Sequence, residues 1–137
     1  MSKNTEYLSK EGYALMGAAF EVHRELGDGL SEEIYQQSLE IELGLRKIPF
    51  SSKDELQIHY KGYLLNKKYI PDLHVYSDIV TELKSVKALN TDHERQLLHY
   101  MRITRKAIGY LINLGPIDKI EWKRYILSEY LPKNSAS

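Results

Sequence analysis

The feature that most restricts the fold is the apolar run AIGYLINL at residues 107–114. Successive side chains of a β-strand point to opposite faces of the sheet, so a strand with one solvent-facing side alternates apolar and polar residues. This run is almost continuously apolar, which is typical of a strand that is covered on both faces. The sequence therefore predicts a sheet with helices packed against it.

The rest of the chain supplies the helices and strands for such an architecture. Predicted helices cover residues 12–26, about 31–43, and a segment that opens at Asn90 and Thr91. Predicted strands cover residues 55–60, about 68–76, about 78–85, 107–114 and 120–127. The order is helix, helix, three strands, helix, strand, strand. It predicts an α/β or α+β fold with a mixed central β-sheet flanked by helices.

Local signals predict where these elements end. Gly44 and Pro49 are expected to end the second helix. Turns are expected at residues 61–62 and 66–68. Thr91 and Glu94 have the spacing of a capping box at the start of the third helix.

Size and composition describe an ordinary globular chain. Its 137 residues are 42% apolar and 28% charged, which predicts a single domain over residues 1–131 and a loose tail at 132–137. The chain has no cysteine, which excludes disulfides, zinc–thiolate sites and thiol nucleophiles. No signal peptide or membrane span is apparent, so a cytoplasmic protein without a membrane partner is expected.

Charge is unevenly distributed although the net charge is zero. Residues 1–60 contain 6 Lys/Arg and 11 Asp/Glu, whereas residues 84–124 contain 9 Lys/Arg and 4 Asp/Glu. The second stretch could form a basic face for an anionic partner. An ordinary solvated helix surface explains the same imbalance, and both interpretations stay open.

Three charged residues occur in a segment otherwise patterned for burial, YIPDLHVYSDIVTELKSV at residues 69–86. Strand alternation places Glu82 and Lys84 on one face, about 7 Å apart along the strand. A tight turn at about Ser77–Asp78 would bring Asp72 of the preceding strand near Glu82. Two such carboxylates repel one another, and a divalent cation with oxygen ligands would relieve the repulsion. A surface strand with a Glu–Lys pair is the alternative.

Two helices carry further candidates. Glu32 shares a helical face with Tyr35 and therefore borders the apolar side of its helix. Its position in the first turn is equally explained by the helix dipole. Gln96 and Tyr100, four residues apart, share one face of a later helix, which could also be an ordinary half-buried helix edge.

Four motifs, taken in order, resemble the PD-(D/E)XK nuclease superfamily and, more closely, small bacterial proteins named for a GxxExxY motif. GLSEEIY at residues 29–35 matches that motif, PDLHV contains Pro71-Asp72, and ELK contains Glu82 and Lys84. HERQLLHY contains His93 and a Q-x-x-x-Y pattern that is similar to the last motif of RecB-type nucleases. GYLINLG at residues 109–115 also fits these proteins, and the resemblance spans about residues 12–127.

The resemblance implies a PD-(D/E)XK restriction-endonuclease-like core that binds Mg²⁺ or Mn²⁺. Asp72 and Glu82 would bind the cation, with Glu32 and the backbone carbonyl of Leu83 as further ligands. Lys84 would position or activate the attacking water and steady the scissile phosphate. The remaining catalytic positions would be Gln96, which orients substrate or water, and Tyr100, which supports Gln96.

The implied activity is metal-dependent hydrolysis of phosphodiester bonds, in DNA in preference to RNA. Lys87, Arg95 and Arg102 are expected to hold flanking phosphates, with Arg105 and Lys106 as further candidates. For Arg102 and Arg105 a solvated helix face is the alternative.

Other functions are also compatible with these residues. A non-catalytic nucleic-acid or protein interaction module on a nuclease fold is the main alternative, and the neutral net charge favours it. Hydrolysis of another phosphate-containing substrate is a third possibility. The 11 tyrosines could serve a homodimer interface or simply belong to the core.

Overall fold

In a computed structural model, residues 6–133 of the chain are described. The helices are α2 (Ser9–Leu26), α3 (Glu32–Leu45) and α4 (Thr91–Thr104), followed near the C-terminal end by a 3₁₀ turn at Ser128–Tyr130. The strands are β1 (Phe50–Ser52), β2 (Leu56–Tyr60), β3 (Tyr63–Tyr69), β4 (Leu73–Val75), β5 (Ile79–Lys84), β6 (Ile108–Asn113) and β7 (Glu121–Ile126). The expected loose tail falls largely on residues 134–137, outside the described residues.

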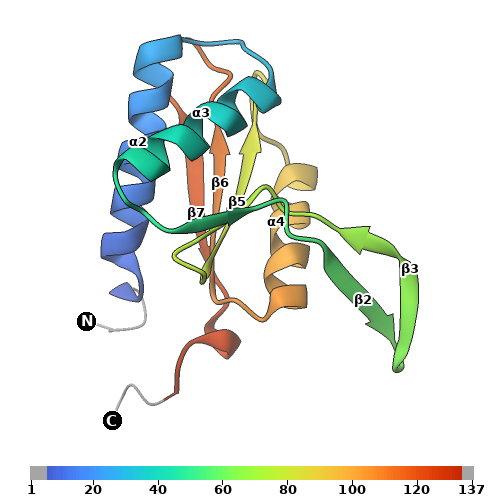
Figure 1. Cartoon of the computed structure of the whole chain (residues 1–137). Coiled ribbons are helices and arrows are strands. Elements are labelled where there is room, and N and C mark those ends of the chain that lie inside the picture. Colours follow the sequence, from blue (N-terminus) through green and yellow to red (C-terminus); the bar gives the residue numbers. More distant parts are fainter. Residues whose placement is uncertain (1–5, 134–137) are drawn as a thin grey trace.

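The main sheet has five strands in the order β1-β4-β5-β6-β7 (Figure 1). Strands β5 and β6 pair in parallel, and the other neighbouring pairs are antiparallel. All six residues of β6 are buried, and β7 forms an edge of the sheet. The predictions of a doubly covered strand, an outer strand and a mixed sheet flanked by helices are confirmed.

Two apolar clusters cover the two faces of this sheet. On one face Ile79 and Leu83 of β5 belong to the larger core, to which α2 and α3 contribute. On the other face Val80 of β5 and Leu111 of β6 pack with residues of α4. The alternation predicted for β5 is therefore observed, and its even-numbered residues face α4.

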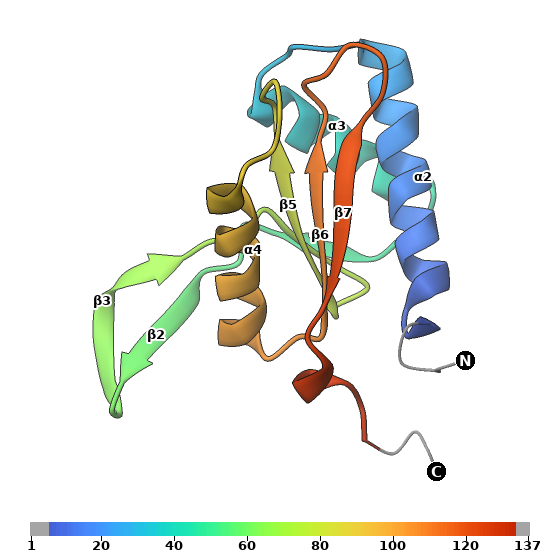
Figure 2. The same ribbon diagram turned by 180° about the vertical axis from the view of Figure 1, so that it is seen from behind.

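Strands β2 and β3 form a separate two-stranded sheet that extends away from the main sheet beside α4 (Figures 1 and 2). The turn at residues 61–62 connects them, as predicted. The turn predicted at residues 66–68 is wrong, because these residues lie inside β3. The single strand predicted at 68–76 is also wrong, because Pro71 and Asp72 separate β3 from β4.

Three shorter features also differ from the predictions. Strand β1 was not predicted, and its three residues alternate only between partial burial and exposure. Helix α3 continues through Gly44 to Leu45. The capping box of α4 is formed by Asn90 and His93, not by Thr91 and Glu94, because Asn90 is the N-cap residue and its third successor is His93.

The connection between α2 and α3 explains two residues of the GxxExxY pattern. Tyr35 is fully buried, its hydroxyl donates to the carbonyl of Gly27 at 2.6 Å, and the hydroxyl accepts from the N–H of Leu30 at 3.2 Å. Gly29 has a φ of 73°, which favours glycine, and its N–H donates to the carbonyl of Gly115 at 3.2 Å. Gly29 and Tyr35 therefore have structural roles.

Tyr35→Phe is expected to lower the free energy of unfolding by about 1–3 kcal/mol, because the partly buried N–H of Leu30 and carbonyl of Gly27 lose a hydrogen-bond partner. Denaturant unfolding measures this change. Tyr13→Phe is the matched control, since Tyr13 is 83% exposed on α2. Equal stabilities of the two variants would contradict the structural role of the Tyr35 hydroxyl.

Within residues 6–133, no helix combines the length and apolar character needed to cross a membrane.

Candidate active site

The antiparallel hairpin of β4 and β5 brings Asp72 and Glu82 together, as the sequence predicts. Its tight turn comprises residues 76–78, and Val75 is paired with Ile79. The N–H of Asp72 donates to Oε2 of Glu82 at 3.0 Å. In return, Oδ2 of Asp72 accepts from the N–H of Leu83 at 2.7 Å. These two bonds fix one oxygen of each carboxylate against the backbone of the neighbouring strand.

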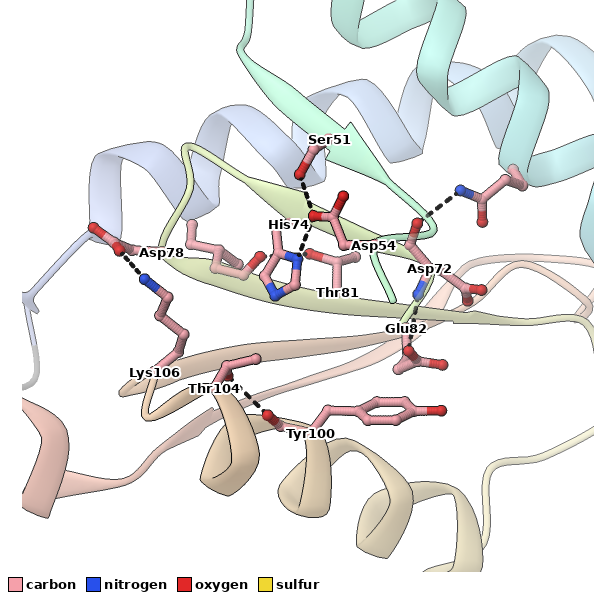
Figure 3. Close-up of polar contacts among 12 residues, drawn as sticks. Ser51, Asp54, Asp72, His74, Asp78, Thr81, Glu82, Tyr100, Thr104 and Lys106 are labelled. Carbon is pink, nitrogen blue, oxygen red and sulfur yellow. Dashed lines mark hydrogen bonds and ion pairs between the residues drawn. The ribbon is translucent and has the colours of Figure 1, made fainter. Parts of the chain in front are cut away.

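Glu82 is a buried carboxylate in an unfavourable electrostatic environment. Its side chain projects toward α4, where the ring of Tyr100 lies (Figure 3), and only 4% of the residue is exposed. Burial raises the pKa of Glu82 well above its usual range, and the negative charge of Asp72 raises it further. The hydrogen bond from Asp72 and the positive charges of Lys84 and Lys53 act in the opposite direction, with smaller effects.

A chain of hydrogen bonds connects Lys84 to α4. The Lys84 Nζ donates to Oε1 of Gln96 at 3.1 Å, and Nε2 of Gln96 donates to the hydroxyl of Tyr100 at 3.3 Å. Burial, followed by the charges of Glu82 and Asp72, raises the pKa of Tyr100 to about 12. Tyr100 is therefore protonated at neutral pH and acts here as a hydrogen-bonding hydroxyl.

Two residues that were not predicted contact Asp72 from outside the hairpin. Nε2 of Gln36 on α3 donates to the backbone carbonyl of Asp72 at 3.0 Å. Nζ of Lys53, just after β1, lies 3.2 Å from Oδ1 of Asp72. Gln36 could have been found from the sequence, because it lies one helical turn after Glu32 on the same face. Lys53 had no such signal, since β1 itself was not predicted.

Glu32 lies on the wall of the same hollow as Asp72 but is exposed. The hollow is lined by Glu32, Glu33, Gln36, Gln37, Glu40, Lys53 and Asp72. Among residues 6–133, no three His, Cys, Asp or Glu side chains converge as a ready metal site. Glu32 therefore shares the hollow without completing a three-residue ligand group.

The donor chemistry of Asp72 and Glu82 nevertheless fits a hard divalent cation. Both offer carboxylate oxygens, which Mg²⁺ prefers. A cation beside them would also offset the repulsion and the burial that raise the pKa of Glu82. Leu83 contributes its N–H to the site, and a role for its carbonyl oxygen stays a prediction.

The predicted phosphate-binding residues lie in different places. Arg95 lines a hollow with Tyr69, Gln96 and Tyr100 and therefore lies beside the candidate site. An ion pair joins Arg95 to Asp92 at 3.2 Å. Lys87 lines a separate hollow around the loop that follows β6.

The remaining basic candidates belong to the far end of α4. Arg102 is in the last turn of the helix, and Arg105 is its C-cap residue. Lys106 is already paired with Asp78 at 2.9 Å, near the start of β5. Because α4 runs back from the Lys84 end of β5 toward its Ile79 end, these three residues are not gathered around the carboxylates.

The mixed sheet, the helices on its faces and the Asp–Glu–x–Lys hairpin define a nuclease-like core. A family model described as the PD-(D/E)XK nuclease superfamily matches residues 9–125. The chain belongs to that superfamily.

Comparison with solved structures supports the fold. The chain is similar to the structure described as "Crystal structure of SSO0001", with a TM-score of 0.56 and 23% sequence identity. The similarity covers 69% of this chain and 48% of that chain, so the match spans about half the length of the other protein. A search among curated proteins found no match.

Proposed function

We propose that this protein is a metal-dependent nuclease that hydrolyses phosphodiester bonds in DNA, in preference to RNA. The buried Glu82 beside Asp72 is the observation that carries the proposal. A carboxylate that is buried next to a second carboxylate is unfavourable for stability alone, and such perturbed groups concentrate at functional sites. Membership of the superfamily supports the same activity.

Mg²⁺ or Mn²⁺ is the cofactor that suits these residues. Asp72 and Glu82 would hold the cation, and we propose Glu32 and the carbonyl of Leu83 as additional ligands. When bound, such a cation lowers the pKa of water and offsets negative charge on a phosphate.

The protein itself supplies positive charge and its positioning. Lys84 follows Glu82 on the face toward α4, and its ammonium group can stabilise the charge that develops on a phosphate oxygen. Gln96 holds that ammonium group through its Oε1. Tyr100 in turn holds Gln96 and stays protonated. Gln96 is exposed, and we propose that it orients a water molecule or the substrate.

Basic residues near this site are proposed to bind flanking phosphates. Arg95 is the best placed, because it shares a hollow with Gln96 and Tyr100. Lys87, which lines a separate hollow, and Arg102, in the last turn of α4, stay predictions of the same kind.

The finer family assignment rests on the sequence motif. We propose that the chain belongs to the GxxExxY group, because Gly29, Glu32 and Tyr35 fill that motif. The bacterial origin, cytoplasmic location and homodimer expected from the sequence stay predictions.

A non-catalytic module on the same fold is the second candidate. One observation favours it: residues 6–133 offer no converged group of three metal-ligating side chains. Such a module would bind nucleic acid or a protein without cleaving it, and substitution of the carboxylates would leave that binding unchanged.

Lys84→Ala is expected to lower the rate of DNA cleavage about 10²–10³-fold, because a preorganised positive charge near the phosphate is lost. The assay is cleavage of labelled single- and double-stranded DNA with Mn²⁺, with RNA as a parallel substrate. Mn²⁺ affinity should change little, since Lys84 is not a ligand.

Lys10→Ala, on the exposed surface of α2, is the matched control and should cleave at the wild-type rate. Cleavage by Lys84→Ala at the wild-type rate would contradict the assigned role. A wild-type protein that cleaves none of the three substrates would favour the non-catalytic module.

A further inference from the structure

The β2–β3 hairpin exposes an aromatic surface that the main fold does not use. Tyr60 and Tyr63 are 61% and 76% exposed. They are directly opposite each other across the hairpin, so both project from the same face. The hairpin extends away from the main sheet (Figures 1 and 2), which leaves these rings open to a ligand.

The charges on the hairpin are all positive. Between Leu56 and Tyr69 the charged side chains are Lys61, Lys67 and Lys68, and there is no Asp or Glu. Lys68 pairs with Glu55 at the base of the hairpin, at 3.0 Å. The Lys61 ammonium lies 5.5 Å from the centre of the Tyr60 ring, so positive charge and an aromatic face occur together at the tip.

This aromatic face leads to the candidate active site. Tyr63 and Tyr69 of β3 are opposite Tyr60 and Leu56 of β2, although the register shifts between these two pairs. Tyr60 and Leu56 are four residues apart on β2 and share a face, so Tyr63 and Tyr69 project from that same side. At the end of the strand the Tyr69 ring meets the Tyr100 ring edge-to-face, with centroids 5.2 Å apart. Tyr69 also lines the hollow that contains Arg95 and Gln96, and Asp72 follows three residues later in the chain.

We propose that the β2–β3 hairpin is a binding arm for an unpaired stretch of a DNA strand, with bases stacked on Tyr60 and Tyr63. Lys61 and Lys67 would lie near the phosphates, and Tyr69 would direct the strand toward Asp72 and Glu82. This inference rests on the proposed nuclease function and specifies its substrate.

Physical chemistry favours this occupant over others. Exposed aromatic rings combined with lysines suit single-stranded nucleic acid, because unpaired bases stack on the rings while the phosphates pair with the cations. In a duplex the bases are already stacked on one another and cannot cover the tyrosines. An apolar protein partner would cover the rings but leave the lysines without matching charge.

The test is fluorescence anisotropy with labelled oligothymidine in EDTA, where metal-dependent cleavage cannot occur. A duplex of mixed sequence is the comparison ligand. Tyr60→Ala/Tyr63→Ala is expected to weaken binding of the single strand about tenfold or more. Tyr60→Phe/Tyr63→Phe keeps the rings and should retain affinity, and Tyr13→Ala, an exposed tyrosine on α2, should bind like the wild type. Circular dichroism verifies that each variant is folded.

Unchanged affinity of the alanine variant for oligothymidine would contradict the proposed binding arm. Tighter binding of the duplex through the same tyrosines would contradict it as well. A wild-type dimer that the alanine variant converts to a monomer, with oligothymidine affinity unchanged, would assign the hairpin to a second copy of the chain instead.

A cleavage assay with Mn²⁺ separates the arm from the proposed function. Tyrosine-dependent binding of single-stranded DNA without any cleavage would support the binding arm and contradict the nuclease proposal. Cleavage of single-stranded DNA at the same rate by the wild type and the alanine variant would contradict the binding arm and leave the nuclease proposal standing.

Discussion

Glu82→Gln is expected to lower the rate of metal-dependent DNA cleavage by about 10³-fold or more. The same substitution is expected to raise the melting temperature of the metal-free protein at neutral pH. Loss of the carboxylate removes a proposed cation ligand. The same change removes a buried carboxyl group whose pKa is raised by burial and by the negative charge of Asp72. The glutamine oxygen can still accept the hydrogen bond from the Asp72 N–H. A gain of about 1 kcal/mol corresponds to about 4 °C for a domain of this size.

The effect of Glu82 on stability can also be measured independently, from the pH dependence of the melting temperature. Because the pKa of Glu82 is raised in the folded state, the folded protein binds its proton more tightly than the unfolded chain. The resulting stabilisation is complete below the pKa of an unfolded glutamate and is lost as the pH rises through the higher, folded pKa. In EDTA, the melting temperature of the wild type should fall over this interval, and Glu82→Gln should lack that contribution.

Glu25→Gln is the matched control for both measurements, since Glu25 is exposed on α2. It should retain cleavage and the wild-type pH profile. Wild-type cleavage by Glu82→Gln would contradict the proposed role of Glu82 as a cation ligand. A wild-type pH profile of Glu82→Gln in EDTA would contradict the raised pKa of the buried Glu82 carboxyl group.

Gly115→Ala is expected to lower the free energy of unfolding by about 3 kcal/mol or more. A Cβ atom at this position would lie 2.5 Å from the carbonyl oxygen and 2.7 Å from the nitrogen of Val86. Both are backbone atoms, and the Asn113 side chain fixes them with a hydrogen bond to each. A displacement of residue 115 would also affect the candidate active site. The neighbouring Leu114 donates its N–H to the carbonyl of Lys84 at 2.9 Å.

Gly44→Ala is the control for this substitution. Nothing lies within 4 Å of a Cβ at Gly44, and alanine favours the helix there by about 1 kcal/mol. Denaturant unfolding should therefore give opposite signs for the two variants. A Gly115→Ala protein as stable as the wild type would contradict the close approach of residue 115 to Val86.

The central hairpin could be predicted because several local rules agree there. Alternation in β5 fixes which residues share the face of Glu82, and a short turn requires Asp72 to be on the neighbouring strand. The apolar run at residues 107–114 likewise permits little except a covered strand. Short-range patterns were sufficient for these features, and the structure confirms their arrangement.

The hairpin β2–β3 was only half predicted, for a physical reason. All of β3 except Tyr69 is exposed, so burial does not impose an apolar alternation on it. Its Asn66, Lys67 and Lys68 consequently resemble a turn. Contacts between segments that are distant in the sequence could not be predicted from local patterns either. The ion pair between Lys53 and Asp72 is an example.

Calorimetric titration of Mn²⁺ into the wild type and into Asp72→Asn/Glu82→Gln tests most directly whether these two carboxylates form the metal site. We predict saturable binding in the wild type and its loss in the double variant, with both proteins folded. Equal Mn²⁺ binding by the two proteins, or none by the wild type, would contradict a metal site at Asp72 and Glu82.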